Sequence, residues 1–141
     1  MKTAKIAWEK HGSAFTVTGG SGFSLHVDEK SGPASASPME LVAMAAGACT
    51  AMDVIDILRK KKQAVTDFEV NVTGVRQQEH PKKFTEIDLE YVVTGRQVDP
   101  TAVERSIELS LTKYCSVNKS LEGSVSIKSH YRVIEAEAIA A

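Results

Sequence analysis

The stretch that decides the fold is Ser37-Pro38-Met39-Glu40-Leu41-Val42-Ala43-Met44-Ala45-Ala46-Gly47-Ala48-Cys49. Ser37 can cap a helix, Pro38 suits the first helical position, and Glu40 follows three residues after Ser37, as in a capping box. From there to Met52 the residues are apolar nearly all round the predicted helix. Such a helix is buried, either in a core or at a subunit interface.

The same helix becomes amphipathic from Asp53 and ends in the basic run Arg59-Lys60-Lys61-Lys62. Cations at this position complement the C-terminal end of the helix dipole. We interpret the run as a solvated helix end, with a polyanion site as the alternative.

Alternating apolar residues predict strands on both sides of this helix. We expect an N-terminal antiparallel meander in residues 3–27, two long antiparallel strands in residues 67–95, and a final strand in residues 125–133. Asp99 and Pro100 predict a second helix to about residue 114, followed by a short helical turn at 115–121 and a frayed tail at 135–141. This order is typical of an α+β fold, here in one domain spanning residues 1–141. Because one sheet layer covers only one side of the apolar helix, we also expect an obligate homodimer.

Composition and net charge limit the classes of partner that the chain is expected to bind. The chain has 141 residues and a formal net charge of −1, which gives no reason to expect nucleic acid or an anionic membrane. We find no signal peptide and no uninterrupted apolar run long enough to span a bilayer. A cytoplasmic location is therefore expected, and thiols there are normally kept reduced.

Two cysteines are the residues able to do thiol chemistry. Cys49 ends the run above, and Cys115 lies in Lys113-Tyr114-Cys115-Ser116-Val117-Asn118-Lys119-Ser120-Leu121. One interpretation is a redox pair, and the other is two small buried residues, since free cysteine is among the most buried residue types. The four histidines show no metal-ligand spacing.

These motifs carry a family likeness. The run from Ser37 to Cys49, followed by Tyr114-Cys115-Ser116-Val117-Asn118, resembles the OsmC/Ohr family of osmotically inducible and organic hydroperoxide resistance proteins. Residues 76–85 and the later Val93-Thr94-Gly95-Arg96 are similar to an uncharacterised bacterial OsmC-like branch.

The resemblance implies a fold and a chemistry. It implies an intertwined α+β homodimer, with antiparallel sheets wrapped around long central helices and two active sites built from both chains. It also implies reduction of organic hydroperoxides in oxidative-stress defence. Cys49 would attack the O–O bond and become a sulfenic acid, Cys115 would resolve it as a disulfide, and an external dithiol, lipoyl in relatives, would reduce that disulfide. No metal or cofactor is implied.

The chain departs from the family pattern at two positions. Relatives supply an Arg from the N-terminal region and a Glu directly after the helix proline, but here the first Arg is Arg59 and Met39 follows the proline. Glu40 comes one residue later, rotated by about 100° around the helix. It is either a structural cap or a catalytic partner. Arg76 is the candidate replacement cation, with a solvated strand-end arginine as the alternative.

The dipole of the helix does not by itself explain how Cys49 would become a thiolate. Cys49 lies about three turns into its helix, where the dipole effect has faded and apolar surroundings raise a thiol pKa. A cation or donor must therefore come from elsewhere in the fold. Cys115 is predicted at the N-cap of the short turn that follows it, where backbone N–H groups favour a thiolate.

Two functions from different classes remain open. The first is a thiol-dependent peroxidase whose apolar substrates would suit a pocket rich in methionine. The second is a non-catalytic dimer that binds a small ligand and has lost the peroxidase Arg and Glu.

Overall fold

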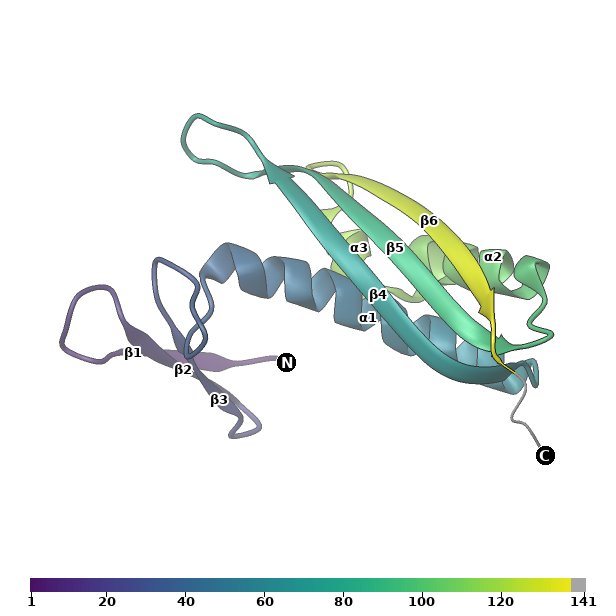
Figure 1. Cartoon of the computed structure of the whole chain (residues 1–141). Coiled ribbons are helices and arrows are strands. Elements are labelled where there is room, and N and C mark those ends of the chain that lie inside the picture. The colour runs from purple at the N-terminus through teal and green to yellow at the C-terminus, as the bar shows by residue number, and fades with distance from the viewer. Residues whose placement is uncertain (138–141) are drawn as a thin grey trace. The chain divides into compact units, whose positions relative to one another are not determined.

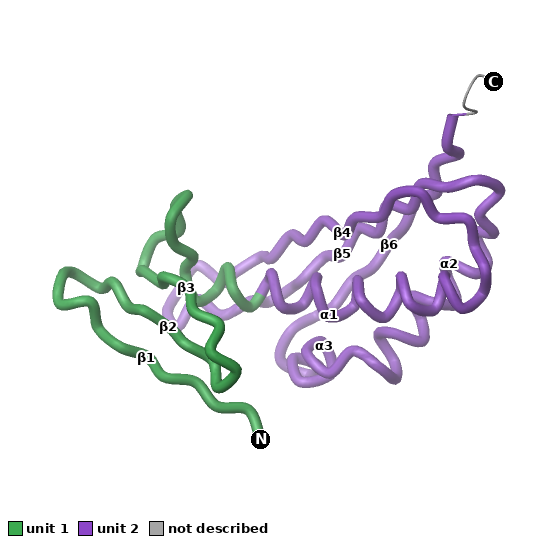
Figure 2. Tube along the Cα trace, turned by 90° about the horizontal axis from the view of Figure 1, so that it is seen from below, with its two compact units in different colours: residues 1–42 green, residues 43–141 purple. Residues whose placement is uncertain are grey.

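The structure is a computed structural model that describes residues 1–137. It divides into two compact units, Met1–Val42 and Ala43–Ala141, shown in green and purple in Figure 2.

The first unit is built on a small antiparallel sheet, as the sequence predicts. Its strands, in the order β1-β2-β3, are β1 (Ala4–Trp8), β2 (Phe15–Gly19) and β3 (Ser24–Val27). Within residues 1–42 the buried hydrophobic residues are Ala14 and Val27, whereas Ile6, Trp8 and Phe23 are each more than half exposed. This sheet therefore has very little core of its own.

The cap of helix α1 (Pro38–Lys60) is formed by two serines. Ser37 Oγ accepts the backbone N–H of Glu40 at 3.2 Å, which confirms the predicted cap. The Ser37 N–H donates to Ser31 Oγ at 3.1 Å rather than to the Glu40 carboxylate. Only one half of the predicted capping box is therefore formed, because the preceding loop supplies the other acceptor.

The second unit contains a sheet in the order β4-β5-β6, made of β4 (Ala64–Arg76), β5 (Phe84–Arg96) and β6 (Ser126–Glu135). The first two strands are antiparallel, as predicted, and β6 runs parallel to β5. Parallel neighbours need a long crossover. Here it consists of α2 (Pro100–Leu109), the π-helix η1 (Ser110–Tyr114) and α3 (Ser116–Leu121).

The core of this unit lies between the sheet and the helices, which cover one face of the sheet (Figure 1). Alternate residues of β5 are fully buried, and α1 and α2 add further apolar side chains to this core: Ile87, Leu89, Tyr91, Val93, Val54, Leu58 and Val103. A Cβ on Gly47 would meet Val72 Cγ2 at 2.5 Å, so the glycine lets α1 approach β4 closely. The mixed α+β class predicted from the sequence is confirmed.

The opposite face of the sheet carries a ladder of charges. Acidic residues of β5 meet basic residues of β6: Glu86 pairs with Lys128 at 2.6 Å, and His130 lies 3.3 Å from Asp88 and 3.6 Å from Glu90. These side chains are partly exposed, so each pair adds little to stability by itself.

Helix α1 has an exposed apolar side in the single chain. Met44 and Met52, two turns apart, are 55% and 66% exposed. Over an 18-residue window its mean hydropathy is 1.8, so by length and composition alone α1 could cross a membrane, although core helices of soluble proteins meet the same test. This differs from our expectation, because an average over the window tolerates Thr50 and Asp53 whereas an uninterrupted run does not.

The second helix begins as predicted. Asp99 Oδ1 accepts the N–H of Thr101 at 2.9 Å, and Pro100 takes the first helical position. The α-helical part ends at Leu109, earlier than expected, because the next five residues form η1. Within the predicted frayed tail, Glu135 instead ends β6, and residues 138–141 lie outside the described part of the chain.

Candidate functional site

The site is built where α1 meets the junction between η1 and α3. Cys49 lies on α1 and is partly exposed, whereas Cys115 is fully buried at the N-cap of α3, the position predicted for it. The backbone N–H of Cys115 donates to Ser110 O at 2.7 Å and closes the π-helical turn. Both cysteines are free thiols.

Three donors lower the pKa of the Cys49 thiol. Burial raises the pKa of this thiol, but the backbone N–H of Val117, the thiol of Cys115 and the hydroxyl of Ser116 outweigh that effect. The Ser116 contact is long, with 3.9 Å between Oγ and Sγ. The resulting pKa lies below the ordinary value, and none of these contributions comes from a cation.

For Cys115, the effects that raise the pKa of the thiol outweigh those that lower it. Burial raises the pKa of its thiol, the nearby Cys49 raises it further, and the backbone and side-chain N–H groups of Asn118 offset only part of this. The side-chain contact is short, with Asn118 Nδ2 2.9 Å from Cys115 Sγ. Cys49 is therefore the more readily ionised of the two thiols, and Cys115 is the one that holds its proton more firmly.

A chain of hydroxyl groups fixes the elements that carry both sulfurs. Thr50 Oγ1 lies 2.7 Å from Tyr91 Oη and 2.7 Å from Ser110 Oγ, and Ser110 donates to Asp53 Oδ2 at 2.9 Å. Burial raises the pKa of Tyr91 to about 12, so its phenol stays protonated. The chain links α1, β5 and η1.

Sequence reasoning missed this network. The only available signal was Thr50 and Asp53, polar residues within or just after the apolar part of a helix. Their partners come from β5 and η1, 41 and 57 residues away along the chain.

The structure places the two remaining candidate residues as follows. Glu40 is exposed in the first turn of α1, nine residues before Cys49. Arg76 is exposed at the end of β4, and its Nε donates to the carbonyl of Lys82 at 2.6 Å across the β4–β5 connection. Within the second unit, Arg76 is therefore engaged with a turn and is not among the groups that shift the pKa of Cys49.

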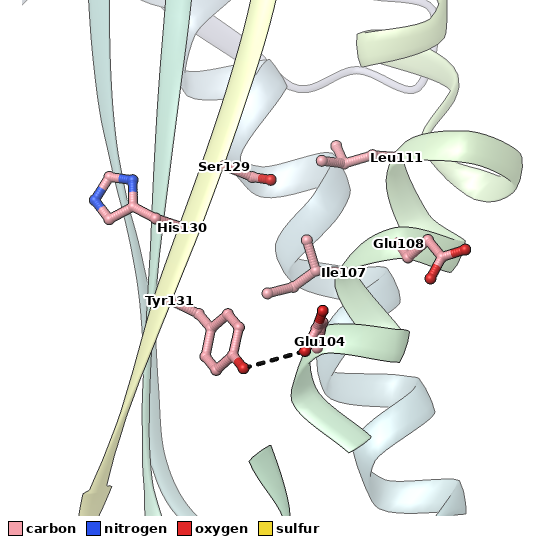
Figure 3. Close-up of a pocket in the computed structure, with 7 residues that line it drawn as sticks. All are labelled: Glu104, Ile107, Glu108, Leu111, Ser129, His130 and Tyr131. Carbon is pink, nitrogen blue, oxygen red and sulfur yellow. Dashed lines mark hydrogen bonds between the residues drawn. The ribbon is translucent and has the colours of Figure 1, made fainter. Parts of the chain in front are cut away.

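Several pockets lie in this unit, and one of about 140 Å³ is lined by Leu111 and Asn118 among others. A second, of about 310 Å³, is lined by Asp53, Leu109 and Tyr114 among others, and neither cysteine is part of its lining. A third, of about 500 Å³, lies between α2 and β6 and contains no sulfur in its lining. There Tyr131 Oη donates to Glu104 Oε2 at 3.4 Å (Figure 3).

In residues 1–137 no three His, Cys, Asp or Glu side chains gather as metal ligands would.

Comparison with known proteins gives a consistent family. The family model described as OsmC-like protein matches residues 29–130. Protein YhfA of Escherichia coli (strain K12) is 44% identical over 133 residues, which is 94% of this chain and 98% of that one.

Solved structures agree in fold. A hypothetical protein from Aquifex aeolicus VF5 is 31% identical with a TM-score of 0.85, over 97% of this chain and 98% of that one. An organic hydroperoxide resistance protein OsmC from Legionella pneumophila is 18% identical with a TM-score of 0.68, over 96% and 97% of the two chains. At that identity the second likeness establishes the fold alone.

Proposed function

We propose, from the premise that this chain belongs to the OsmC-like protein family, that it reduces organic hydroperoxides with Cys49 and Cys115. The observation that carries the proposal is that the two thiols differ in exposure and in the direction of their pKa shifts. Cys49 is partly exposed with a lowered pKa, and Cys115 is buried beside it with a raised pKa. A peroxidatic cysteine must be an accessible thiolate, and a resolving thiol must stand close to it.

The first step is oxidation of Cys49. Its thiolate attacks the outer oxygen of the hydroperoxide, an S–O bond forms and the O–O bond breaks. The alkoxide takes up a proton and leaves as an alcohol, and Cys49 becomes a sulfenic acid. The donors Val117 N–H and Ser116 Oγ–H favour the thiolate here, which is the part that an arginine plays in relatives.

The second step is resolution. The sulfur of Cys115 attacks the sulfur of the sulfenic acid, an S–S bond forms, and the hydroxide leaves with the Cys115 proton as water. An external dithiol, lipoyl or another, then reduces the disulfide and restores both thiols. No metal or cofactor takes part in this proposal.

A second copy of the chain completes the proposed site. Met44, Ala48 and Met52 recur every four residues and form the exposed apolar side of α1, next to Cys49. A partner helix laid against them would bury this side and enclose the thiols in apolar surroundings suited to an alkyl or aryl peroxide. Glu40 and Arg76 stay candidate catalytic residues of the proposed dimer, since neither contributes to the lowered pKa of Cys49 within one chain.

The proposal treats residues 1–141 as one OsmC-like domain in the cytoplasm. The family match at residues 29–130 crosses the boundary between the two compact units, which supports a single domain. Two free thiols suit a compartment that keeps cysteines reduced.

The alternative is a dimer that binds a small ligand without turnover. The observation that favours it is that no cation contributes to the lowered pKa of Cys49. In that case the pocket beside Asp53 and Tyr114 would hold the ligand, and the thiols would stay reduced.

One experiment separates the two functions. The reduced protein is titrated for thiols before and after an organic hydroperoxide is added, and the product is analysed by mass spectrometry. Loss of both thiols with a Cys49–Cys115 link supports the peroxidase. Two intact thiols at excess peroxide would refute it and favour the binding protein.

A further inference from the structure

Asn118 is a buried polar residue in contact with a reacting atom. It is 3% exposed, and its Nδ2 donates to Cys115 Sγ at 2.9 Å and to Ala46 O at 3.1 Å. Ala46 is on α1, one turn before Cys49. A single amide group therefore joins α1 to the buried thiol.

The orientation of this amide is fixed by its partners. If the amide were flipped, Oδ1 would face the carbonyl oxygen of Ala46, and two acceptors would repel each other. With Nδ2 in that place, Oδ1 is left buried without a donor in the described part of the chain. A buried acceptor without a partner is costly and calls for an explanation. A leucine of similar volume would avoid the cost but would provide no N–H to sulfur.

We propose that Asn118 is the residue that makes the buried Cys115 able to resolve oxidised Cys49. This inference rests on the proposed peroxidase. Cys115 must release its proton before its sulfur attacks, so negative charge is concentrated on that sulfur at the start of the step. The charge leaves it as the S–S bond forms and the S–O bond of Cys49 breaks, and the departing hydroxide takes up the released proton as water. An N–H donor at 2.9 Å stabilises that charge on a sulfur that is itself fully buried.

The same donor has no contact with Cys49. The groups that favour the Cys49 thiolate are Val117 N–H, the Cys115 thiol and the Ser116 hydroxyl. Loss of the Asn118 amide is therefore expected to slow resolution and to leave attack on the peroxide nearly unchanged. This separation distinguishes a role in the reaction from general damage to the fold.

The test begins without any peroxide. In a Cys49→Ser background, the ionisation of Cys115 is followed through its ultraviolet thiolate absorbance, with Asn118 intact and with Asn118→Leu or Asn118→Asp. We expect the Cys115 midpoint to rise by about one pH unit in the leucine variant, and further in the aspartate variant, whose carboxylate repels the thiolate. A midpoint unchanged in both variants would overturn the inference.

The second measurement uses the two-cysteine protein and an organic hydroperoxide. Sulfenic acid on Cys49 is trapped with dimedone while disulfide formation is timed. In Asn118→Leu we expect disulfide formation to slow about threefold, with the sulfenic acid accumulating, because the loss of thiolate is partly offset by the stronger nucleophilicity of a thiolate of higher pKa. Wild-type disulfide rates in the variant would overturn the inference, whereas absence of any oxidation in the wild-type protein would overturn the proposed peroxidase instead.

A matched control removes another buried hydrogen bond. Ser106 is fully buried on α2, and its Oγ donates to Ala102 O at 2.6 Å, away from both sulfurs. Ser106→Ala should lower stability without changing Cys115 ionisation or the rate of resolution. Should Asn118→Leu fold poorly, Asn118→Asp keeps the size and polarity of the side chain and tests the same donor.

Discussion

The two cysteines lie near each other but in contrasting surroundings. Cys49 lies on a long helix, is partly exposed, and receives its donors from the start of α3, far along the chain. Cys115 is fully enclosed, and its surroundings favour the protonated form. The contrast shows that burial and the direction of a few N–H and O–H groups shift the pKa values of two chemically identical side chains in opposite directions. No arginine within the second unit is needed to set it up.

Substitution of either cysteine by serine is expected to have the largest effect on peroxide consumption. Cys49→Ser should abolish peroxide consumption, because no accessible thiolate remains. Cys115→Ser should permit a single reduction and then stall at the sulfenic acid. Consumption of peroxide and dimedone labelling measure both outcomes. Equal residual turnover in the two variants would contradict the assigned roles.

A second prediction measures the contrast directly in the reduced wild-type protein. At neutral pH, iodoacetamide should alkylate Cys49 faster than Cys115, because the thiolate is the reactive form and Cys49 is both more exposed and more readily ionised. As the pH rises, the Cys49 rate should level off first, since its pKa is lowered while that of Cys115 is raised. Peptide mass spectrometry gives both rates, and indistinguishable rates would disprove the contrast.

A third prediction tests the scaffold that holds both sulfurs. Tyr91→Phe removes a phenol bonded to Thr50 and should lower the free energy of unfolding by about 1 kcal/mol. Tyr131 stands opposite Tyr91 in the parallel register, and its hydroxyl makes only a 3.4 Å contact at an exposed site. Tyr131→Phe is therefore the matched control and should have a smaller effect. Urea denaturation measures the free energy of unfolding of both variants. Equal losses would show that the buried hydroxyl chain stabilises the fold no more than an exposed hydroxyl contact does.

A fourth prediction weakens one donor. Ser116→Ala removes the hydroxyl 3.9 Å from the Cys49 sulfur and should raise the pKa of that thiol slightly. Alkylation of Cys49 at neutral pH should then slow by a few fold at most. An unchanged alkylation rate would mean that Val117 and Cys115 suffice as donors.

The smallest expected change has the opposite sign. Asp53 raises the pKa of Cys49 by charge repulsion, and it also accepts from Ser110. Asp53→Asn keeps an acceptor for Ser110 but removes the charge, so the Cys49 pKa should fall a little and alkylation should quicken. A pH profile of alkylation tests this, and a rise in the Cys49 pKa would contradict it.

Much of the fold could be predicted from local chemistry. Ser37 and Asp99 mark helix starts through groups within three residues of themselves, and the alternation in β4 and β5 needs no distant partner. The same holds for the N-cap position of Cys115. These features depend on short-range patterns that a single sequence contains.

The rest depends on long-range geometry. The parallel direction of β6 follows from the crossover through α2, η1 and α3. The π-helical turn determines the position of Cys115, which directly follows it. The donors to Cys49 come from Val117 and Ser116, more than 60 residues away. No periodicity in the sequence encodes such an approach, so the sequence could name both sulfurs but not the groups that distinguish them.

The charge ladder on β5 and β6 has a consequence for self-association. Strand β6 is an edge of its sheet, and unpaired edges invite other strands to add and build aggregates. Its outer face carries Lys128 and Arg132, whose acidic partners lie inward on β5 rather than beyond the edge. Two molecules joined edge to edge through β6 would bring these cations together, and like charges opposite each other disfavour strand pairing. The ladder thus disfavours edge-to-edge pairing of two copies through β6.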